Sequence, residues 1–466
     1  MERTISMTSN NHQEPNMQRL VPWIIYIIFF AVLNETVFNV STPNIASQFH
    51  LNPSQVSWII TIFIIFFGMG SVIYGKLSDA FSIKKLISFG ILLYSSSSIV
   101  GFIFHSNYPI VIVARALQGA GASAIPALVM IIIARYFTKE QRGKLFGMIT
   151  STVSFAIGIG PVLGGYVSGT YHWSYLFVIP IFSLVALPFI HRILPDEAGE
   201  GGILDVIGTV LMGITVSSLI LYLTEADWFY LPVFVVALIW FIIHIRRTAN
   251  PFVEPELFSN RLYRNGLIIG FLIFSTVMAV MFVLPLMLHD LYQLKTQTIG
   301  LIMFPGAFSA VIFGTVAGNL TVKKGSHFVV YLGLGLITLS LFLQSSVVGA
   351  WVWYFGIVLV IQYVGFSFLQ TALIESVTNI LPNKQIGVGM GFYNLISFVS
   401  GAIGTALVSK AMELPILKVA IHPLVSNPSA YLFSNLMLIF TLIVIASALL
   451  YFITFGKQEN LSEESA

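Results

Sequence analysis

Charged side chains are scarce in this chain. Only 9% of its 466 residues are Asp, Glu, Lys or Arg, while 57% are hydrophobic. Soluble domains carry about 25% charged residues, so this composition excludes an ordinary soluble domain. No polar stretch is long enough to form a separate catalytic domain. The chain is therefore expected to lie almost wholly within a membrane.

Two further absences exclude classes of chemistry. The sequence has no cysteine, which rules out disulfides and Cys-ligated metals. It has no G-x-x-x-x-G-K-[ST] motif, so nucleotide-driven pumping by this chain is not expected. The net charge is only +3 and the basic residues are scattered, which leaves no patch for nucleic acid. We expect no bound cofactor and no metal site.

Long apolar runs are abundant. A helix of about 18 or more apolar residues can cross the hydrocarbon core of a bilayer. The polar N-terminal tail lacks the basic start and small-residue cleavage site of a secretory signal, so the first run is expected to be retained. The pattern predicts an all-α integral membrane protein with fourteen spans, near 20–41, 57–75, 86–104, 109–133, 145–168, 173–193, 204–223, 228–245, 266–288, 298–320, 328–346, 350–374, 387–409 and 430–454.

The distribution of basic residues predicts how these spans are oriented. Eighteen of the 22 Lys and Arg residues fall in predicted loops on the side of the two termini. Three, Lys295, Lys410 and Lys418, fall on the opposite side, and Arg115 lies within a span. Because basic loops stay in the cytoplasm, both termini are expected there and the protein in the cell membrane.

A weak internal repeat predicts the domain organisation. The second span of each presumed half is followed by a Gly-started basic turn, GKLSDAFSIKK (75–85) and GNLTVKKGS (318–326). Secondary transporters are commonly built from two similar halves that enclose a cavity at the middle of the membrane. We therefore expect a tail (1–19), a six-helix half (20–193), an inserted pair of helices with its loops (194–265), a second six-helix half (266–454) and a tail (455–466).

Two opposite charges inside the spans are the first functional candidates, because charge in a membrane is costly. Glu35, in LNETVFNVSTPNIA (33–46), lies six residues before the outer end of the first span, and Arg115 lies six residues into the antiparallel fourth span. Both are thus about 9 Å from the outer end and could pair or share a polar cavity. Desolvation and a nearby cation together decide whether a carboxylate can exchange a proton. The alternative is a structural ion pair.

Polar residues near these charges could line the same cavity. Asn39 is four residues from Glu35 and shares its face of the helix, whereas Asn34 points about 100° away. Hydrogen bonding between helices is the alternative for each amide. The expected cavity residues are Asn34, Asn39, Gln118, Gln362, Gln370, Tyr393 and Asn394.

Two further motifs suggest moving parts. AIGIGPVLGG (156–165) combines glycines that permit close helix packing with a proline that permits a bend, which suggests a hinge or sliding surface. Its residues are Gly158, Gly160, Pro161, Gly164 and Gly165. The turn after the second span is a candidate gating loop, although its lysines could serve orientation alone. Its candidate residues are Gly75, Asp79, Lys84 and Lys85.

These motifs resemble a known family. GKLSDAFSIKK, RALQGAGASA and GIGPVLGG are similar to signatures of the major facilitator superfamily, and fourteen spans resemble its drug:proton antiporter branch. VLNETVFNVSTPNIA, QGAGASAIPALVMIIIARY and HWSYLFVIP resemble the L and K class of tetracycline exporters. The resemblance implies export of a tetracycline–divalent-cation complex in exchange for protons, with Glu35 and Arg115 in the coupling machinery.

The sequence also departs from that class. The resemblance implies acids at three positions where this chain has Ile157, Val322 and Gly401. Fewer carboxylates mean fewer proton sites and less attraction for a cationic complex, so a broader drug range or a native metabolite stays open as the substrate.

Other functions remain as alternatives to drug export. A proton-coupled importer is the closest one, and a sensor on the same fold is more distant. The nine His residues lie mostly at span ends or in loops, which argues against a membrane-embedded enzyme. The expected partners are a small-molecule drug and the lipid bilayer, and the chain is expected to be monomeric.

Overall fold

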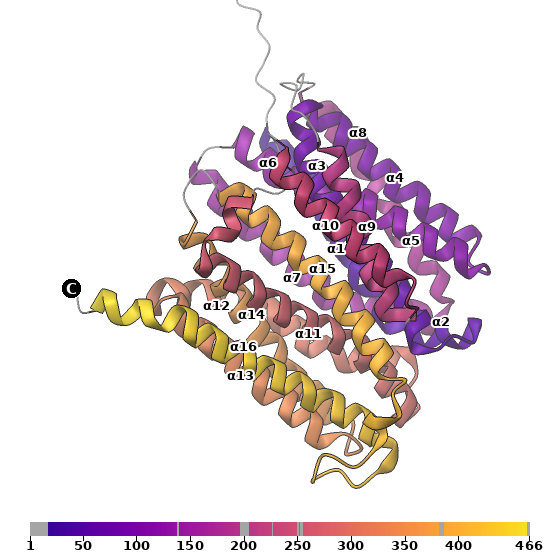
Figure 1. Cartoon of the computed structure of the whole chain (residues 1–466). Coiled ribbons are helices and arrows are strands. Elements are labelled where there is room, and N and C mark those ends of the chain that lie inside the picture. The colour runs from indigo at the N-terminus through magenta and orange to yellow at the C-terminus, as the bar shows by residue number, and fades with distance from the viewer. Residues whose placement is uncertain are drawn as a thin grey trace, which may run out of the picture.

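The fold is described from a computed structural model of the whole chain. It describes residues 17–137, 139–195, 205–225, 227–248, 251, 255–381 and 386–463. Every regular element in those ranges is a helix. Figure 1 shows the helices as one elongated bundle, with the first half of the chain on one side and the last helices, α13 and α16, on the other.

The first half contains seven α-helices before a mixed sixth span. They are α1 (Val21–Val37), α2 (Thr42–Phe49), α3 (Pro53–Ala80), α4 (Ile83–Ile103), α5 (Tyr108–Ala122), α6 (Ala124–Tyr136) and α7 (Lys139–Thr170). Polar residues begin several of them. Asn52 starts α3 by accepting the Gln55 N–H at 2.8 Å, while the Gln55 side chain accepts the Asn52 N–H at 3.0 Å. This reciprocal pair satisfies two N–H groups that a helix start otherwise leaves free.

The sixth predicted span is not a simple α-helix. Residues Trp173–Ala186 form a 3₁₀ helix, and α8 (Leu187–Ile193) continues it. Pro180 lies inside the 3₁₀ segment and has no N–H to donate to the preceding turn, which disfavours regular α-helix there. The apolar pattern predicted the span, and the proline accounts for its different helical geometry.

The inserted pair and the second half complete the bundle. The inserted helices are α9 (Val206–Glu225) and α10 (Tyr230–Arg247). The second half contains α11 (Arg261–Tyr292), α12 (Thr296–Lys324), α13 (Ser326–Val347), α14 (Trp353–Asn379), α15 (Ile386–Ala411) and α16 (Tyr431–Glu463). All fourteen predicted ranges overlap helical segments among the described residues.

The number of spans is a separate question from their positions. Twelve described helical segments are long and apolar enough to cross a membrane. The fifth and thirteenth predicted spans fall on α7 and α15, whose apolar described stretches are shorter, Phe155–Thr170 and Leu395–Ala411. Fourteen spans therefore stays a prediction, whereas a multi-pass helical membrane protein is established.

The two halves meet along two pairs of helices. α7 packs against α12, and α3 packs against α15. Within the inserted pair, α9 contacts α3 and α15, while α10 packs chiefly against α9 (Figure 1). We call the end of the bundle at Ala80–Ile83 the inner end and the other the outer end, after the predicted orientation. The central cavity described below lies between the two halves.

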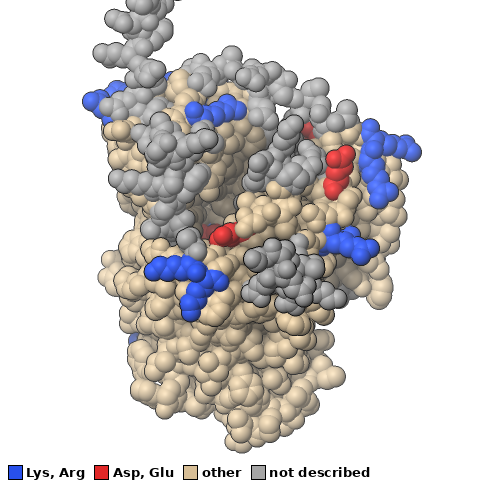
Figure 2. Space-filling model, turned by 90° about the vertical axis from the view of Figure 1, so that its left-hand side faces the viewer, with Lys and Arg blue, Asp and Glu red and all other residues tan. Residues whose placement is uncertain are grey.

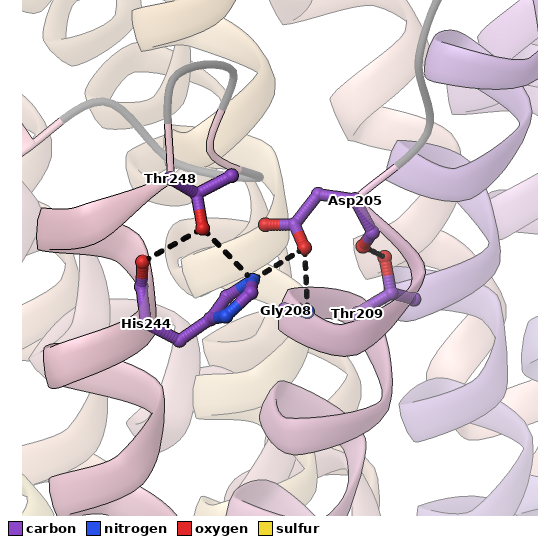
Figure 3. Close-up of polar contacts among 5 residues, drawn as sticks. All are labelled: Asp205, Gly208, Thr209, His244 and Thr248. Atoms are coloured by element: carbon purple, nitrogen blue, oxygen red, sulfur yellow. Dashed lines mark hydrogen bonds and ion pairs between the residues drawn. The ribbon is translucent and has the colours of Figure 1, made fainter.

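A buried polar contact ties the inserted helices together at the inner end (Figure 3). The Asp205 carboxylate accepts the Gly208 N–H at the start of α9 at 2.8 Å, and the same oxygen is 2.6 Å from His244 Nε2 on α10. The Thr248 hydroxyl donates to the His244 carbonyl at 2.9 Å. A carboxylate that caps one helix and binds the next fixes their relative register.

Candidate functional site

A cavity lies between the two halves at the level of Glu35. Helices α1, α3, α7, α11, α12 and α14 contribute its walls. Its volume is about 80 Å³, below the roughly 300–1,000 Å³ of pockets that enclose drug-sized ligands. A substrate of that size therefore requires the halves to separate further. Figure 2 shows the left-hand side of Figure 1, with Lys and Arg side chains scattered over this face of the bundle.

The cavity wall combines a few polar groups with a large apolar surface. The polar side chains are Glu35, Thr36, Asn39, Gln362, Tyr363, Ser367 and Gln370. Most of the remaining wall is aliphatic, aromatic or methionine, including Met278, Met281, Met303, Phe282 and Phe366. Methionine adapts its shape to different partners, and amides and hydroxyls both donate and accept hydrogen bonds. Such a wall suits an amphipathic small molecule.

Glu35 is the one carboxylate among the described residues that line this cavity. Its side chain is partly exposed, and no other described residue forms a hydrogen bond or an ion pair with it. Thr36 on α1 and Asn39, in the short 3₁₀ helix Asn39–Ser41 that follows it, line the same cavity, as the four-residue spacing from Glu35 to Asn39 predicts. The carboxylate is thus free to meet a proton or a substrate from the cavity.

Arg115 interacts electrostatically with Glu35, but it forms no ion pair with that carboxylate and does not line the cavity, which corrects the expectation of a direct pair or a shared cavity. It is fully buried within the first half, where Nε donates to the Ile59 carbonyl at 2.9 Å and Nη1 donates to Gln118 Oε1 at 3.0 Å. The guanidinium carbon lies 4.2 Å from the ring centroids of both Phe38 and Phe63. The two charges lie within electrostatic range of each other but form no direct ion pair, because α5 directs the guanidinium toward α3.

Gln118 acts with Arg115 and not as a cavity residue. Its Nε2 donates to Ser98 Oγ on α4 at 2.7 Å, so both ends of the amide are occupied. The second half contains a similar buried bond between its own third and fourth helices, where Gln344 Nε2 donates to Gln362 Oε1 at 2.6 Å. The sequence pattern did not identify Gln344 as the partner that orients Gln362 toward the cavity.

The other predicted cavity residues divide into two groups. Asn39, Gln362 and Gln370 line the cavity, whereas Asn34 and Tyr393 are buried away from it. Asn34 is rotated by one residue from Glu35, and Tyr393 packs against Gly270 and Phe274 of α11. The side chain of Asn394 lies outside the described residues.

The glycines of α7 face two different helices. A Cβ added to Gly160 or Gly164 would lie 2.0 Å from Thr36 Oγ1 or 2.2 Å from the Val37 carbonyl oxygen, both in the first half. A Cβ on Gly165 would lie 2.6 Å from the Thr296 carbonyl oxygen of α12, across the boundary between the halves. A Cβ on Gly158 would lie 3.1 Å from the carbonyl oxygen of Ala307 on α12, also across the boundary. The close approach predicted for this motif is present on both sides of the helix.

Pro161 is also part of the boundary. Its carbonyl oxygen would lie 2.3 Å from a Cβ added to Gly300 of α12. Polar contacts continue this seal toward the outer end, where Thr296 Oγ1 donates to Asn44 Oδ1 at 3.0 Å. The outer half of the boundary between α7 and α12 is therefore tightly closed in this structure.

The predicted gating loop is described only in part. Gly75 has open space where a Cβ would stand, Lys84 is half-buried and Lys85 is exposed. The side chain of Asp79 lies outside the described residues, so its gating role stays a prediction. The resemblance implies acids at three positions where this chain has other residues. Of these, Ile157 lines the cavity and Gly401 packs against Met278, while the side chain of Val322 is not described.

Arg115→Lys is expected to destabilise the first half. A lysine ammonium cannot donate as a planar fork to Ile59 and Gln118 or stack equally well between two rings. Leaving a buried acceptor unsatisfied costs about 1–3 kcal/mol, so the unfolding temperature in detergent should fall measurably. Arg192→Lys, at an exposed position, is the control. Equal unfolding temperatures for both variants would show that this arrangement contributes no stability.

Comparison with known proteins agrees with this architecture. The family model of the Major Facilitator Superfamily matches residues 24–405. The riboflavin transporter RibZ of Clostridioides difficile (strain 630) is 27% identical over 401 residues, which cover 83% of this chain and 87% of the relative. The multidrug transporter protein MdtP of Bacillus subtilis (strain 168) is 27% identical over 319 residues, covering 66% and 58%.

Solved structures show the same fold at low sequence identity. A crystal structure of a peptide transporter POT in complex with sulfate matches with a TM-score of 0.68 and 16% identity, covering 94% of both chains. A nucleoside transporter, NupG, matches with a TM-score of 0.66 and 10% identity, covering 94% of this chain and 99% of that one. The chain therefore belongs to the Major Facilitator Superfamily and is a membrane transporter, not an enzyme.

Proposed function

We propose that this transporter exports an amphipathic small molecule in exchange for protons, with Glu35 as the proton-binding group. The observation that carries the proposal is the position of Glu35, a carboxylate on the wall of the cavity between the halves without an ion-pair partner among the described residues. An ionisable group inside a membrane protein is costly and marks an ion or substrate pathway. Substrate and proton would compete for this carboxylate.

The chemistry of the wall limits the substrate class. A single negative charge beside amides, hydroxyls, methionines and aromatic rings suits a neutral or singly cationic molecule with a flat apolar face. A tetracycline–divalent-cation complex has this character, and the motifs of the first half resemble tetracycline exporters. We therefore propose tetracycline-type drugs as the first substrate class.

A neutral heterocyclic metabolite is the second candidate. Three carboxamides, Asn39, Gln362 and Gln370, lie on the wall and can pair with the polar edge of a heterocycle. The riboflavin transporter among the relatives supports this possibility. Ile157 stands in the wall where the resemblance implies an acid, which favours a substrate of low charge.

The substrate class can be tested with everted membrane vesicles that hold an acidic interior. Tetracycline with Mg²⁺, ethidium and riboflavin are added separately, and uptake is measured with and without collapse of the pH gradient. We expect gradient-dependent uptake of at least one compound. Uptake of riboflavin alone would select the metabolite. Uptake that is indifferent to the gradient would contradict proton coupling.

A further inference from the structure

The loop between α15 and α16, residues 412–430, is unusually apolar for a segment outside the spans. Ile416 and Leu424 are each 70% exposed, and Leu414, Val419 and Ile421 are exposed as well. Between residues 414 and 430, Lys418 is the single Asp, Glu, Lys or Arg. Loops that face water are usually polar, and clustered exposed apolar side chains mark a surface that contacts something. We call residues 412–430 the outer loop.

The backbone of the outer loop is held low against α16. Asn435 Nδ2 donates to the Leu417 carbonyl at 2.9 Å and to the Val419 carbonyl at 2.8 Å. Asn435 is the fifth residue of α16, which places it about 6 Å below the start of the helix. These bonds hold residues 417–419 beside the first turns of α16, and Figure 1 shows the loop next to the start of that helix.

A second contact places the outer loop beside the surface of α13. The buried His422 lies with its ring centroid 6.1 Å from that of Phe342, and its Nε2 is 3.4 Å from Ser346 Oγ. Phe342 lies five residues before the end of α13, about 7.5 Å inside the span. It is also exposed on the outside of the bundle, where the membrane lies. The loop thus reaches the depth of the outermost turns of two spans.

Interfacial aromatic residues surround the same place. Gly349, between α13 and α14, is close to Ala430 and Asn427 of the outer loop. Trp351, Trp353 and Tyr354 follow it and are exposed. Trp and Tyr gather at the headgroup level of a bilayer, because their rings are amphipathic. The exposed apolar surface of the outer loop is therefore continuous with the lipid-facing surface of the bundle.

We propose that the outer loop lies in the interface of the outer leaflet, with Ile416 and Leu424 among the upper acyl chains of glycerophospholipids. Lys418 can extend its amine to the phosphate groups while its methylenes stay in apolar surroundings. Segments with an exposed apolar face and few charges bind membranes in this manner. The outer loop would thus anchor the second half at the membrane surface, whatever the substrate.

The absence of cysteine makes a direct test straightforward. Ile416→Cys and Leu424→Cys are labelled with an environment-sensitive nitrobenzoxadiazole dye in nanodiscs of phosphatidylcholine and phosphatidylglycerol. Leu442→Cys, exposed within α16, is the lipid control, and Ser47→Cys, exposed on α2, is the water control. Quenching is measured with lipids brominated near the top of the acyl chain and with aqueous iodide.

The proposal predicts that both loop labels emit at shorter wavelength than the label at position 47. We expect brominated lipid to quench them at least half as strongly as the label at position 442, with iodide quenching reduced at least twofold relative to position 47. Emission and iodide quenching equal to those at position 47 would overturn the proposal. That outcome would leave the exposed apolar surface for a protein partner outside the membrane.

Discussion

Glu35→Gln is expected to abolish proton-driven transport while leaving the fold intact. Glutamine has nearly the same shape and can still form hydrogen bonds, but it cannot bind and release a proton. Glu35 forms no direct ion pair with any described residue, and the buried Arg115, whose charge Glu35 favours, keeps its hydrogen bonds to Ile59 and Gln118 in the variant. In everted vesicles, gradient-dependent uptake of the identified substrate should fall to the level of vesicles without the protein. Unfolding temperature should stay close to that of the wild type.

Controls separate coupling from binding and from general loss of charge. Glu375→Gln removes a carboxylate at the inner part of α14, outside the residues that line the cavity, and should keep gradient-driven uptake. Binding of a neutral substrate to Glu35→Gln, measured by intrinsic tryptophan fluorescence, should persist. Wild-type gradient-driven uptake by Glu35→Gln would remove the residue from the coupling mechanism.

Gly165→Ala is expected to open the outer seal and slow transport about tenfold or more. The added methyl group would lie 2.6 Å from the Thr296 carbonyl oxygen, so α7 and α12 must move apart. The closed outer end is one of the states that alternating access requires. A cost of about 1.4 kcal/mol in that state reduces its population relative to the open one tenfold.

The change in accessibility can be measured directly. On a Gln297→Cys background, at the contact between α12 and Gly169 of α7, Gly165→Ala should speed reaction with a maleimide in nanodiscs several-fold. Gly335→Ala is the matched control, because a Cβ there meets no atom within 4 Å. Equal labelling rates in both variants would contradict the view that the Gly165 contact seals the outer end.

Periodicity and spacing determined much of this architecture in advance. Apolar run length predicted the helical segments, and the four-residue spacing from Glu35 to Asn39 correctly placed both side chains on the cavity wall. The glycines at positions 160 and 164 predicted a close helix contact, which α1 provides. These features are local, since each depends only on the helical geometry of one short stretch of the chain.

Features that depend on the rotation and partner of a helix were not predictable in this way. Arg115 has the predicted depth, but its direction is set by Ile59 and the two rings that enclose it. Asp205 and His244 are 39 residues apart and meet because α9 and α10 pack together. No pattern in the sequence predicts that these two residues interact. Depth along the membrane normal follows from residue number, whereas rotation about the helix axis requires the packed structure.

The central claim is that one transport event exchanges substrate for protons through the cavity that contains Glu35. Its most direct test uses purified protein in liposomes with an acidic interior and a pH-sensitive dye outside. The account predicts that adding the substrate identified in vesicles acidifies the outside medium in the wild type, and that no acidification occurs with Glu35→Gln. Substrate entry without proton release from the wild-type protein would contradict it.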